Sequence, residues 1–479
     1  MEQIIEVMKS TMIVCLLVVS FSSCTAQKQT VQLNESSDRP TAFPGAEGFG
    51  KYTTGGRGGK VFIVTNINDD GDGSLRKAVT TKGPRMVVFA ISGTIHLASP
   101  LTIRSDITVA GQTAPGDGIC LADYPVTLGG DNIIVRFLRF RMGDKNQKGG
   151  MVNGNGGDDA FGGTHRKNII IDHCSMSWST DEVFSVYGGD STTLQWNLIS
   201  EPLNYSYHFE TGDSDYEHHG YGAIWGGRHS SFHHNLFAHC NSRTPRFDGI
   251  RNIPEENGDF ANNVIYDWGH NNVYAGEGGS YNIVNNYFRY GPSTSESVKF
   301  RIANPWSKPP TIKFGKWYVD GNYVDGSSSV TKSNRRGVIA DKGTEDDKKS
   351  LLIKQPFQFL EIKMQTAEEA YKSVLKSVGA IFPKRDTLDE RIINDVKNTT
   401  GHMIDVQGGY PHGTAYELTV NAWPALKSLP APKDSDADGI PDDWEKKNGL
   451  NPNDASDASA YKLSKAYTNI EVYINSLVE

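Results

Sequence analysis

Two arginines stand three residues apart in the stretch HCNSRTPRFDG, at positions 243 and 246, with Pro245 between them. A guanidinium group binds a carboxylate through two parallel hydrogen bonds. Proline fixes the local backbone and removes a donor, which suits a rigid presentation of both side chains. Arg243 and Arg246 are therefore candidates for binding or activating an acidic ligand. The alternative for Arg243 is a surface salt bridge.

A second group of chemically capable residues lies near the C-terminus, in DSDADGIPDDWE. The spacing matches an EF-hand calcium loop, with glycine at the sharp turn and glutamate supplying the last oxygens. Loop positions 1, 3, 5, 6, 9 and 12 are occupied by Asp434, Asp436, Asp438, Gly439, Asp442 and Glu445. Because Pro430 and Pro432 precede the loop, we expect an isolated calcium loop with a structural role. A solvated acidic turn is the alternative.

The charge balance limits the partners. The 479 residues carry a net charge of −8 and the pI is near 5.9. This field repels nucleic acid, anionic lipid and acidic polysaccharide alike. We expect no nucleic-acid partner, and any other polyanion must be met by local cations. The 50 glycines and 20 tyrosines favour turns and strands, so we expect a β-rich protein.

The elements that must position these residues are short strands. From about residue 61, β-branched and aromatic runs such as IIVRFLRF, TLQWNLIS and YNIVNNYF recur every 20 to 40 residues, bounded by Gly, Asn and Asp. Each run is predicted to be a strand. Comparable places in successive runs are held by Asn197, Asn235, Asn263, Asn286 and Asn322. Stacked asparagines can hydrogen-bond to the coils above and below, which predicts an all-β protein built as a parallel β-helix.

After about residue 340 the sequence becomes charged and helix-favouring. Capping boxes are predicted at Thr366 with Glu369 and at Thr387 with Glu390. The two helices are expected to cap the open end of the solenoid. The predicted organisation is a signal peptide over 1–24, a β-helix catalytic domain over 42–340, a helical capping extension over 341–430 and a calcium-loop tail over 431–479.

The N-terminus carries an apolar run, TMIVCLLVVSFSSC, of signal-peptide length. FSSC resembles a bacterial lipobox, which would make Cys24 an acylated residue of an outer-surface lipoprotein; cleavage after Ala26 is the alternative. Cys120, Cys174 and Cys240 remain, an odd number without metal-ligand spacing, so we expect buried thiols and no disulfide framework. We expect a secreted or surface-anchored monomer.

Several motifs together resemble the family 1 polysaccharide lyases, the pectate lyases. They are GAEGFG, GDGSLRKAV, SGTIHL, ITVAGQTAPGDGI, DHCSMSWSTDE and SRTPRF, in the expected order over roughly residues 42 to 330. The segments SWSTDE and YGAIWGG are similar to those of a bacterial subgroup. The resemblance implies a right-handed parallel β-helix that cleaves de-esterified homogalacturonan, or polygalacturonate, by Ca²⁺-dependent β-elimination.

The resemblance also assigns roles to residues. Asp159 and Asp181 match calcium aspartates of the family, and Asp158 and Glu182 are candidates for further ligands. Calcium prefers oxygen ligands, and as a Lewis acid it stabilises charge that develops on a carboxylate. For the two aspartates the alternative is a turn residue that caps its own backbone.

Arg243 matches the base that the family uses to remove the proton on carbon 5, and Arg246 matches a substrate-carboxylate clamp. A free guanidinium is protonated at neutral pH. A base role therefore requires strong depression of its pKa by Ca²⁺, Arg246 and low solvent access; otherwise Arg243 only stabilises charge.

The chain departs from the family pattern at three places. Ser185 stands where relatives often place another calcium aspartate, and Asp248 stands where they often have a third arginine. The lysine of many relatives has no counterpart in EHHGYGAIWGG. His219 and Tyr221 are candidate substrate contacts there, with His218 as a third candidate. The pair Asp172 and His173 is interpreted as structural.

Three other functions compete with this interpretation. A polygalacturonase would need a carboxylate cluster for hydrolysis, but no Arg-Ile-Lys element follows GHN at residue 269. A pectin lyase acting on methyl-esterified pectin should lack the acidic calcium site. A β-helix that binds pectin at the cell surface without cleaving it is suggested by Ser185 and the missing lysine. Products separate them, because only a lyase creates an unsaturated uronate.

Overall fold

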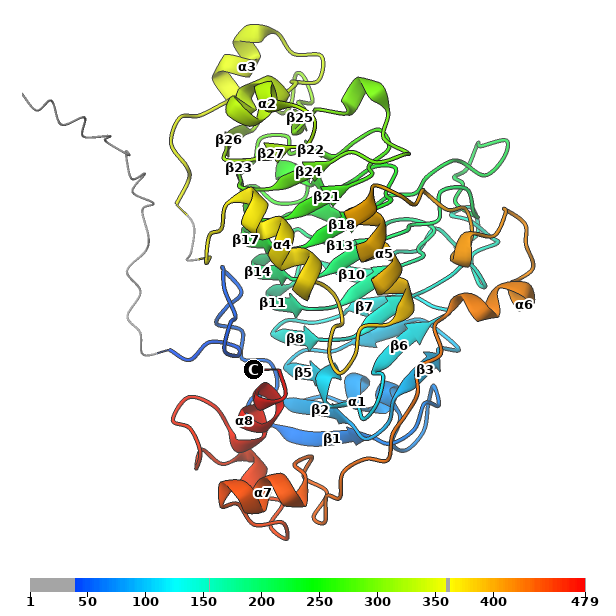
Figure 1. The fold of residues 1–479 in the computed structure, drawn as a ribbon, viewed down its shortest axis with the longest axis vertical. Coiled ribbons are helices and arrows are strands. Elements are labelled where there is room, and N and C mark those ends of the chain that lie inside the picture. Colours follow the sequence, from blue (N-terminus) through cyan, green and yellow to red (C-terminus); the bar gives the residue numbers. More distant parts are fainter. Residues whose placement is uncertain (1–38, 155, 359–361, 479) are drawn as a thin grey trace, which may run out of the picture. The chain divides into compact units, whose positions relative to one another are not determined.

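Three parallel sheets build the fold (Figure 1). The computed structural model describes residues 39–154, 156–358 and 362–478. The ten-stranded sheet contains β1 (Lys60–Val64), β2 (Arg85–Phe89), β5 (Ile107–Ala110), β8 (Ile133–Arg136), β11 (Lys167–Asp172), β14 (Asp190–Gln195), β17 (Arg228–His233), β20 (Asn257–Ala261), β23 (Ser280–Val284) and β26 (Lys316–Asp320).

The other two sheets follow the same order. The nine-stranded sheet contains β3 (Gly93–His96), β6 (Ile119–Ala122), β9 (Arg139–Arg141), β12 (Ser175–Ser177), β15 (Leu198–Ser200), β18 (Leu236–Ala238), β21 (Val264–Tyr266), β24 (Tyr287–Arg289) and β27 (Tyr323–Val324). The eight-stranded sheet contains β4 (Leu101–Ile103), β7 (Val126–Leu128), β10 (Phe161–Thr164), β13 (Phe184–Tyr187), β16 (Ile224–Trp225), β19 (Arg246–Phe247), β22 (Val273–Ala275) and β25 (Ala303–Pro305). Each coil from β2–β4 to β23–β25 contributes one strand to each sheet, so the predicted parallel β-helix is confirmed.

The predicted strands are divided by a bend. The run TLQWNLIS was expected to be one strand, but β14 ends at Gln195 and β15 begins at Leu198. Between them Trp196 takes a left-handed conformation (φ 57°), and His234 does the same one coil later (φ 56°). A left-handed residue turns the chain sharply, so each run passes from the ten-stranded to the nine-stranded sheet.

The predicted asparagine ladder is confirmed at this bend. The backbone N–H of Asn197 donates to Oδ1 of Asn235 at 2.9 Å, and Asn235 donates to Asn263 in the same way at 2.9 Å. The series continues through Asn286 and Asn322 and ends at Asn334. Each side chain satisfies buried donors of its neighbouring coil, because an amide offers both donors and acceptors.

The interior of the coils is apolar and stacked. Phe140 of β9, Phe161 of β10 and Phe184 of β13 stack inside the solenoid, with ring centroids 3.9 Å and then 5.4 Å apart. The three cysteines of the described residues, Cys120, Cys174 and Cys240, are free and buried, as predicted.

Two helices cover the outer face of the nine-stranded sheet (Figure 1). They are α4 (Ala367–Ser377) and α5 (Thr387–Asn398). The predicted capping box of Thr366 and Glu369 is confirmed. The second one is wrong: the N-cap of α5 is Asp386, whose side chain accepts from the backbone N–H of Asp389. Asp386 precedes Thr387 and is also held by the buried Arg139 and Arg141.

The position of α4 and α5 differs from the expected end cap. The last coils are instead covered by α2 (Ser328–Lys332) and α3 (Glu345–Leu351). Val330 and Leu351 of these helices join the interior cluster that contains Trp317 of β26. The start of the predicted extension over 341–430, which contains α3, therefore does cover the end of the solenoid, whereas α4 and α5 lie on its side.

Three more α-helices of the described chain belong to the C-terminal part, and one to the first coil. They are α6 (Tyr416–Thr419), α7 (Asp442–Asn448), α8 (Asn469–Ser476) and, after β1, α1 (Leu75–Thr80). Within the described residues, no helix has the length and apolar character needed to cross a membrane. The predicted signal segment 1–24, with Cys24, lies outside the described residues.

Candidate functional site

Four successive coils bring polar side chains to one edge of the eight-stranded sheet. Asp159 precedes β10, Glu182 precedes β13, Tyr221 precedes β16 and Arg243 precedes β19. Glu182 pairs in parallel with Tyr221, and Tyr221 pairs with Ser242 on the next coil. The edge where these strands begin therefore collects the residues that the sequence indicated.

A glycine permits the close approach of two of these coils. A Cβ atom at Gly222 would lie 2.6 Å from the carbonyl oxygen of Arg243. The backbone N–H of Ala223 donates to that same oxygen at 2.7 Å. Arg243 has a left-handed backbone (φ 59°), and the following Thr244–Pro245 peptide is cis. The turn that presents Arg243 is thus fixed by the neighbouring coil and by its own backbone.

Three carboxylates gather at this edge. Asp159, Asp181 and Glu182 each place an oxygen within 4.8 Å of the others. Oδ1 of Asp159 also accepts from the backbone N–H of Glu182 at 3.1 Å. Burial, reinforced by the negative charges of Asp181 and Asp158, raises the pKa of Asp159 well above its usual value. The group has the composition of a site for a hard cation.

Asp158 and Ser185 border the three carboxylates. Oδ2 of Asp158 accepts from Nε2 of Gln147 at 2.8 Å, and burial raises the pKa of Asp158. The Ser185 hydroxyl hydrogen-bonds with Asp159, which favours ionised Asp159, and it accepts from the backbone N–H of Ile224 at 3.1 Å. Ser185 thus contributes a hydroxyl oxygen where a carboxylate was anticipated from the family pattern.

Arg243 reaches across two coils to this cluster. Its Nη1 forms an ion pair with Oε1 of Glu182, and its Cζ lies 4.5 Å from the ring centroid of Tyr221. Tyr221 therefore forms a platform under the guanidinium, as aromatic faces do for cations. The side chain of Arg243 is 23% exposed, while that of Glu182 is 5% exposed.

A pair of histidines adjoins Asp181, and the sequence indicated only one of them, His219. Nε2 of His219 is 2.8 Å from Oδ1 of Asp181, and the ring of His208 stacks on the ring of His219 with centroids 3.8 Å apart. Glu217 binds both rings from the other side. His208 and Glu217 belong to the irregular segment between β15 and β16, which carries no periodic pattern. The backbone N–H of Glu217 also donates to the carbonyl oxygen of His208 at 2.9 Å, which holds the two ends of this segment together.

The charges in this histidine pair differ. Burial opposes the charged form of His219, but its hydrogen bonds to Asp181 and Glu217 prevail and raise its pKa. Burial and the neighbouring His219 lower the pKa of His208. Burial likewise favours neutral Asp181, yet the bond from His219 and the charges of His219, His208 and Arg243 lower its pKa. His219 and Asp181 therefore form a charged pair beside the carboxylates.

Arg246 occupies a more enclosed position than Arg243. It lies in β19, is 5% exposed, and its Nη2 donates to Oε1 of Glu277 at 3.3 Å. Asp248 accepts from Nδ2 of Asn252 at 2.8 and 2.9 Å. His218 hydrogen-bonds with Asn204 at 3.2 Å and stacks on Tyr205, on the exposed surface.

Two further groups lie away from this edge. Asp172 of β11 forms ion pairs with Arg136 and His173, each at 2.8 Å, on the ten-stranded sheet. This agrees with the structural role expected for Asp172 and His173. The predicted calcium loop with Asp434, Asp436, Asp438, Asp442 and Glu445 belongs to the C-terminal part, beside β1 and β2 (Figure 1).

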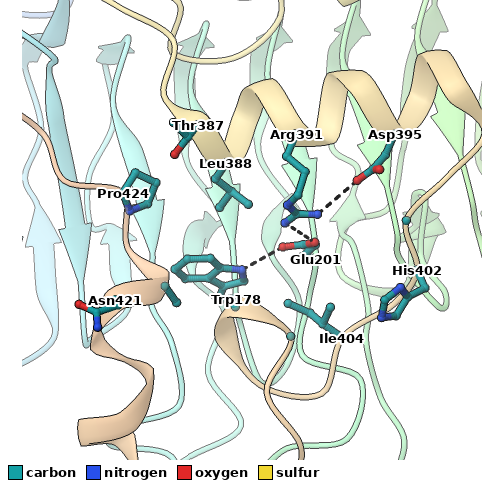
Figure 2. Close-up of a pocket in the computed structure, with 14 residues that line it drawn as sticks. Trp178, Glu201, Thr387, Leu388, Arg391, Asp395, His402, Ile404, Asn421 and Pro424 are labelled. Carbon is teal, nitrogen blue, oxygen red and sulfur yellow. Dashed lines mark hydrogen bonds and ion pairs between the residues drawn. The ribbon is translucent and has the colours of Figure 1, made fainter.

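A cavity of about 650 Å³ lies under α5, on the side of the nine-stranded sheet (Figure 2). Glu201 is the centre of its polar network: it accepts from Nε1 of Trp178 at 3.2 Å and from Arg391 at 2.7 Å. Arg391 also binds Asp395 at 3.3 Å. These three charged groups pair with one another. The residues that line the cavity include neither the carboxylates of the cluster beside β10 and β13 nor Arg243 or Arg246.

The comparisons with known proteins match nearly the whole chain. It is 36% identical over 447 residues to a probable pectate lyase C from Aspergillus terreus, which covers 91% of this chain and 94% of that protein. A probable pectate lyase C from Neosartorya fischeri is 36% identical over 454 residues, with the same coverage of 91% and 94%. A solved pectate lyase bound to a hexasaccharide is 13% identical with a TM-score of 0.48 and covers 72% of this chain and 99% of that one. No family model matches the chain. From the identity to its relatives and their coverage, the chain belongs to the pectate lyase family and is a polysaccharide lyase.

Proposed function

We propose that the chain cleaves de-esterified homogalacturonan (polygalacturonate) by Ca²⁺-dependent β-elimination, releasing 4,5-unsaturated oligogalacturonates. The observation that carries this proposal is the convergence of Asp159, Asp181, Glu182 and Arg243 at one edge of the eight-stranded sheet. A cation site and a guanidinium placed together can both engage one acidic sugar ring.

The chemistry of β-elimination determines which groups the site needs. A base removes the proton on carbon 5, next to the carboxylate, and the electron pair of that C–H bond forms the double bond to carbon 4. The bond between carbon 4 and the glycosidic oxygen breaks, and the oxygen leaves with its electron pair and then takes a proton. Negative charge develops beside a carboxylate that is already negative, so fixed positive charge must be present where it develops.

The residues of the cluster fit a calcium ion. Asp159, Asp181 and Glu182 offer carboxylate oxygens within 4.8 Å of one another, which are the ligands that Ca²⁺ prefers. The pKa of Asp159 is raised because the carboxyl group is buried among like charges. A bound cation would offset these charges. When bound, Ca²⁺ supplies Lewis-acid stabilisation of charge on the substrate carboxylate. Asp158 is a further candidate ligand beside these three.

Arg243 is the proposed base. Its guanidinium is partly exposed at this edge and is oriented by Glu182 and by the ring of Tyr221. To accept the proton from carbon 5, Arg243 must release Glu182 and be neutral at that moment. Tyr221 limits the directions in which the side chain can move. Without this loss of a proton, Arg243 acts by stabilising charge.

His219, Tyr221 and Arg246 are the proposed substrate contacts. The charged pair of His219 with Asp181 places an imidazolium beside the cluster, where many relatives have a lysine. Tyr221 offers a ring face next to Arg243. Nη2 of Arg246 lies 3.3 Å from Oε1 of Glu277 in this structure. To bind a substrate carboxylate, Arg246 would have to release Glu277.

We also propose that the chain is exported, with Cys24 as a lipid anchor, and acts as a monomer. The support is the apolar run before Cys24. The relatives named above are fungal, so the bacterial lipoprotein type rests on this N-terminal pattern. Replacing Cys24 with serine and locating the protein between membrane and medium tests the anchor: release into the medium is expected, and unchanged membrane association would contradict it.

Product analysis tests the proposed reaction. The protein is incubated in parallel with polygalacturonate and with highly methyl-esterified pectin, and products are followed by ultraviolet absorbance and by mass. We expect unsaturated products from polygalacturonate that stop forming in chelator. New reducing ends without absorbance would indicate hydrolysis. Preferred cleavage of esterified pectin in chelator would indicate a pectin lyase, and the absence of any product would indicate a binding protein.

A further inference from the structure

The C-terminal acidic loop packs directly on the first strands of the solenoid. Gly439 has φ 92°, and a Cβ atom there would lie 3.0 Å from Val61 and from Val88. The next residue, Ile440, is fully buried in a cluster with Met86 and Val88 of β2. A glycine is therefore required at this position by both the backbone and the contact with the sheet.

The loop encloses carboxylate oxygens that have no hydrogen-bond partner among the described residues. Six such oxygens are buried: Asp436 Oδ1 and Oδ2, Asp438 Oδ2, Glu445 Oε1 and Oε2, and Asp457 Oδ1. Glu445 is 0% exposed and Asp438 is 3% exposed. A buried carboxylate without a partner is costly, so these oxygens indicate a bound cation. Six is also the lower limit of the oxygen ligands that calcium takes.

The geometry divides these residues into two overlapping groups. Asp434, Asp436 and Asp438 place oxygens within 4.8 Å of one another, and so do Asp438, Glu445 and Asp457. Asp438 belongs to both groups and joins them. Asp457 lies twelve positions after Glu445, in the turn that follows α7, and is outside the spacing of the loop motif.

Asp442, at loop position 9, has a different role. Its Oδ1 accepts from the backbone N–H of Ser435 at 2.7 Å, and its Oδ2 accepts from the Ser435 hydroxyl at 2.8 Å and from Lys433 Nζ at 2.7 Å. These bonds use both oxygens and lower the pKa of Asp442 to about 2. The carboxylate of Asp442 is thus committed to holding the start of the loop.

We propose that Asp434, Asp436, Asp438, Glu445 and Asp457 bind one Ca²⁺ ion that fixes the C-terminal segment onto the first coils. The site is distinct from the cluster of the proposed function and is not required for the chemistry. Asp457 takes the place that the loop spacing assigned to Asp442.

The location of the ligands explains what the ion would hold together. Asp438 lies in the loop, Glu445 on α7 and Asp457 in the following turn, so one ion would join three parts of the segment. The segment then continues into α8, where Glu471 forms an ion pair with Arg57 at 2.8 Å and Asn475 accepts from Arg136 at 3.1 Å. Ile440, Ile470 and Ile474 cover the outer face of β1, β2 and β5.

Loss of the ion would leave like charges enclosed. Oxygens of Asp438, Glu445 and Asp457 lie within 4.8 Å of one another, and several of them are buried without a hydrogen-bond partner among the described residues. Without the ion these carboxylates would repel one another, and the segment would detach more easily from β1 and β2. The ion therefore acts on the stability of the N-terminal coils.

Terbium luminescence gives a direct test, because Trp444 lies in the loop and can sensitise a bound lanthanide. The experiment uses the full chain with Asp159→Asn and Asp181→Asn, which removes the proposed catalytic site, and compares it with the same chain carrying Glu445→Gln, Asp457→Asn, Asp442→Asn or Asp443→Asn. The last is the matched control, since Asp443 follows Asp442 in the first turn of α7 but is fully exposed. We expect sensitised emission, displaced by Ca²⁺, to persist in Asp442→Asn and Asp443→Asn and to fall at least tenfold in the other two. Emission unchanged in Asp457→Asn would overturn the ligand set.

Limited trypsin digestion of the unmutated chain tests the structural role without any substitution. Lys446, Lys447 and Lys462 lie in the segment and are cleavage sites. We expect Ca²⁺ to slow cleavage at these lysines and to raise Tm by about 3 °C at a hundredfold excess over Kd. Equal cleavage with Ca²⁺ and with chelator, or equal protection by Mg²⁺, would overturn the proposal. Repeating both measurements with the Asp159→Asn, Asp181→Asn chain, which should give the same result, separates this outcome from the proposed function.

Discussion

Arg243 and Glu182 form an ion pair although one coil of the solenoid lies between them along the sheet edge. The contact depends on Tyr221, whose ring supports the guanidinium from the intervening coil. In the absence of substrate, the proposed base and a proposed calcium ligand thus neutralise each other. Binding of substrate and cation must break this ion pair, so the positions of Arg243 and Glu182 depend on each other.

Arg243→Lys tests whether the guanidinium itself is needed. The lysine keeps a positive charge near Glu182 but lacks the fork and the reach of arginine. We expect kcat to fall by roughly 10² to 10⁴, the range that a positioned acid or base contributes, with little change in Tm. Arg336→Ala, at an exposed position in the turn after α2, is the control and should leave kcat unchanged. A kcat within twofold of the unmutated enzyme would remove Arg243 from the chemistry.

Asp159→Asn tests the cation site with the backbone contact preserved. The amide oxygen can still accept from the N–H of Glu182, while the negative charge is lost. We expect the Ca²⁺ concentration for half-maximal activity to rise at least tenfold. Asp131→Asn is the matched control, because Asp131 is an exposed turn aspartate that accepts from the backbone N–H of Lys167 at 2.9 Å. An unchanged Ca²⁺ requirement in Asp159→Asn would contradict its assignment as a ligand.

Asn263→Ala tests the asparagine ladder. Asn263 is fully buried, accepts from the backbone N–H of Asn235 at 2.9 Å and donates to the carbonyl of Phe232 at 2.9 Å. Removing it leaves buried groups unpaired, and we expect the free energy of unfolding to fall by about 2 to 4 kcal/mol. Denaturant unfolding measures this. Asn394→Ala, on the exposed face of α5, should change it by less than about 0.5 kcal/mol.

His239 predicts a pH dependence of stability. Burial alone would lower its pKa, but its bonds to Asp267 (2.7 Å) and Asp395 raise the pKa to about 9. A pKa raised above the unfolded value of about 6.5 gives stability that is complete below that pH and is lost as pH rises through about 9. The loss should be about 3 kcal/mol.

His239→Gln should remove this dependence, because glutamine does not titrate. Unfolding curves at several pH values between these limits compare the two proteins, with the exposed His165→Gln as the control. Parallel pH profiles for the unmutated protein and His239→Gln would show that the imidazole is not charged in the folded state.

The fold was largely predictable because its pattern repeats. The asparagines recur at one position of each coil, and each occupies a bend where its amide pairs with the next coil. The division of each run into two strands at this bend was missed, since the left-handed residues there include Trp196 and His234 where glycine would have been the usual signal. Tertiary contacts impose that conformation.

The candidate site was predictable only where motifs mark it. Asp159, Asp181, Glu182 and Arg243 precede β10, β13 and β19 of one sheet, so their meeting follows from the register. His208 and Glu217 come from an irregular segment, and Asp457 lies beyond the loop spacing. Their positions depend on how the chain folds back, which no local pattern specifies. Asp442 matched the loop pattern, but Lys433 and Ser435 occupy both of its oxygens.

The most direct test of calcium-dependent elimination is a calcium titration of polygalacturonate cleavage. The ultraviolet absorbance of the unsaturated product reports the reaction. The enzyme is first stripped with chelator, and Ca²⁺ is then added back to the unmutated protein and to Asp159→Asn. We expect no product before addition, full recovery in the unmutated protein, and a curve displaced to higher Ca²⁺ in the variant. Undiminished product formation in excess chelator would contradict it.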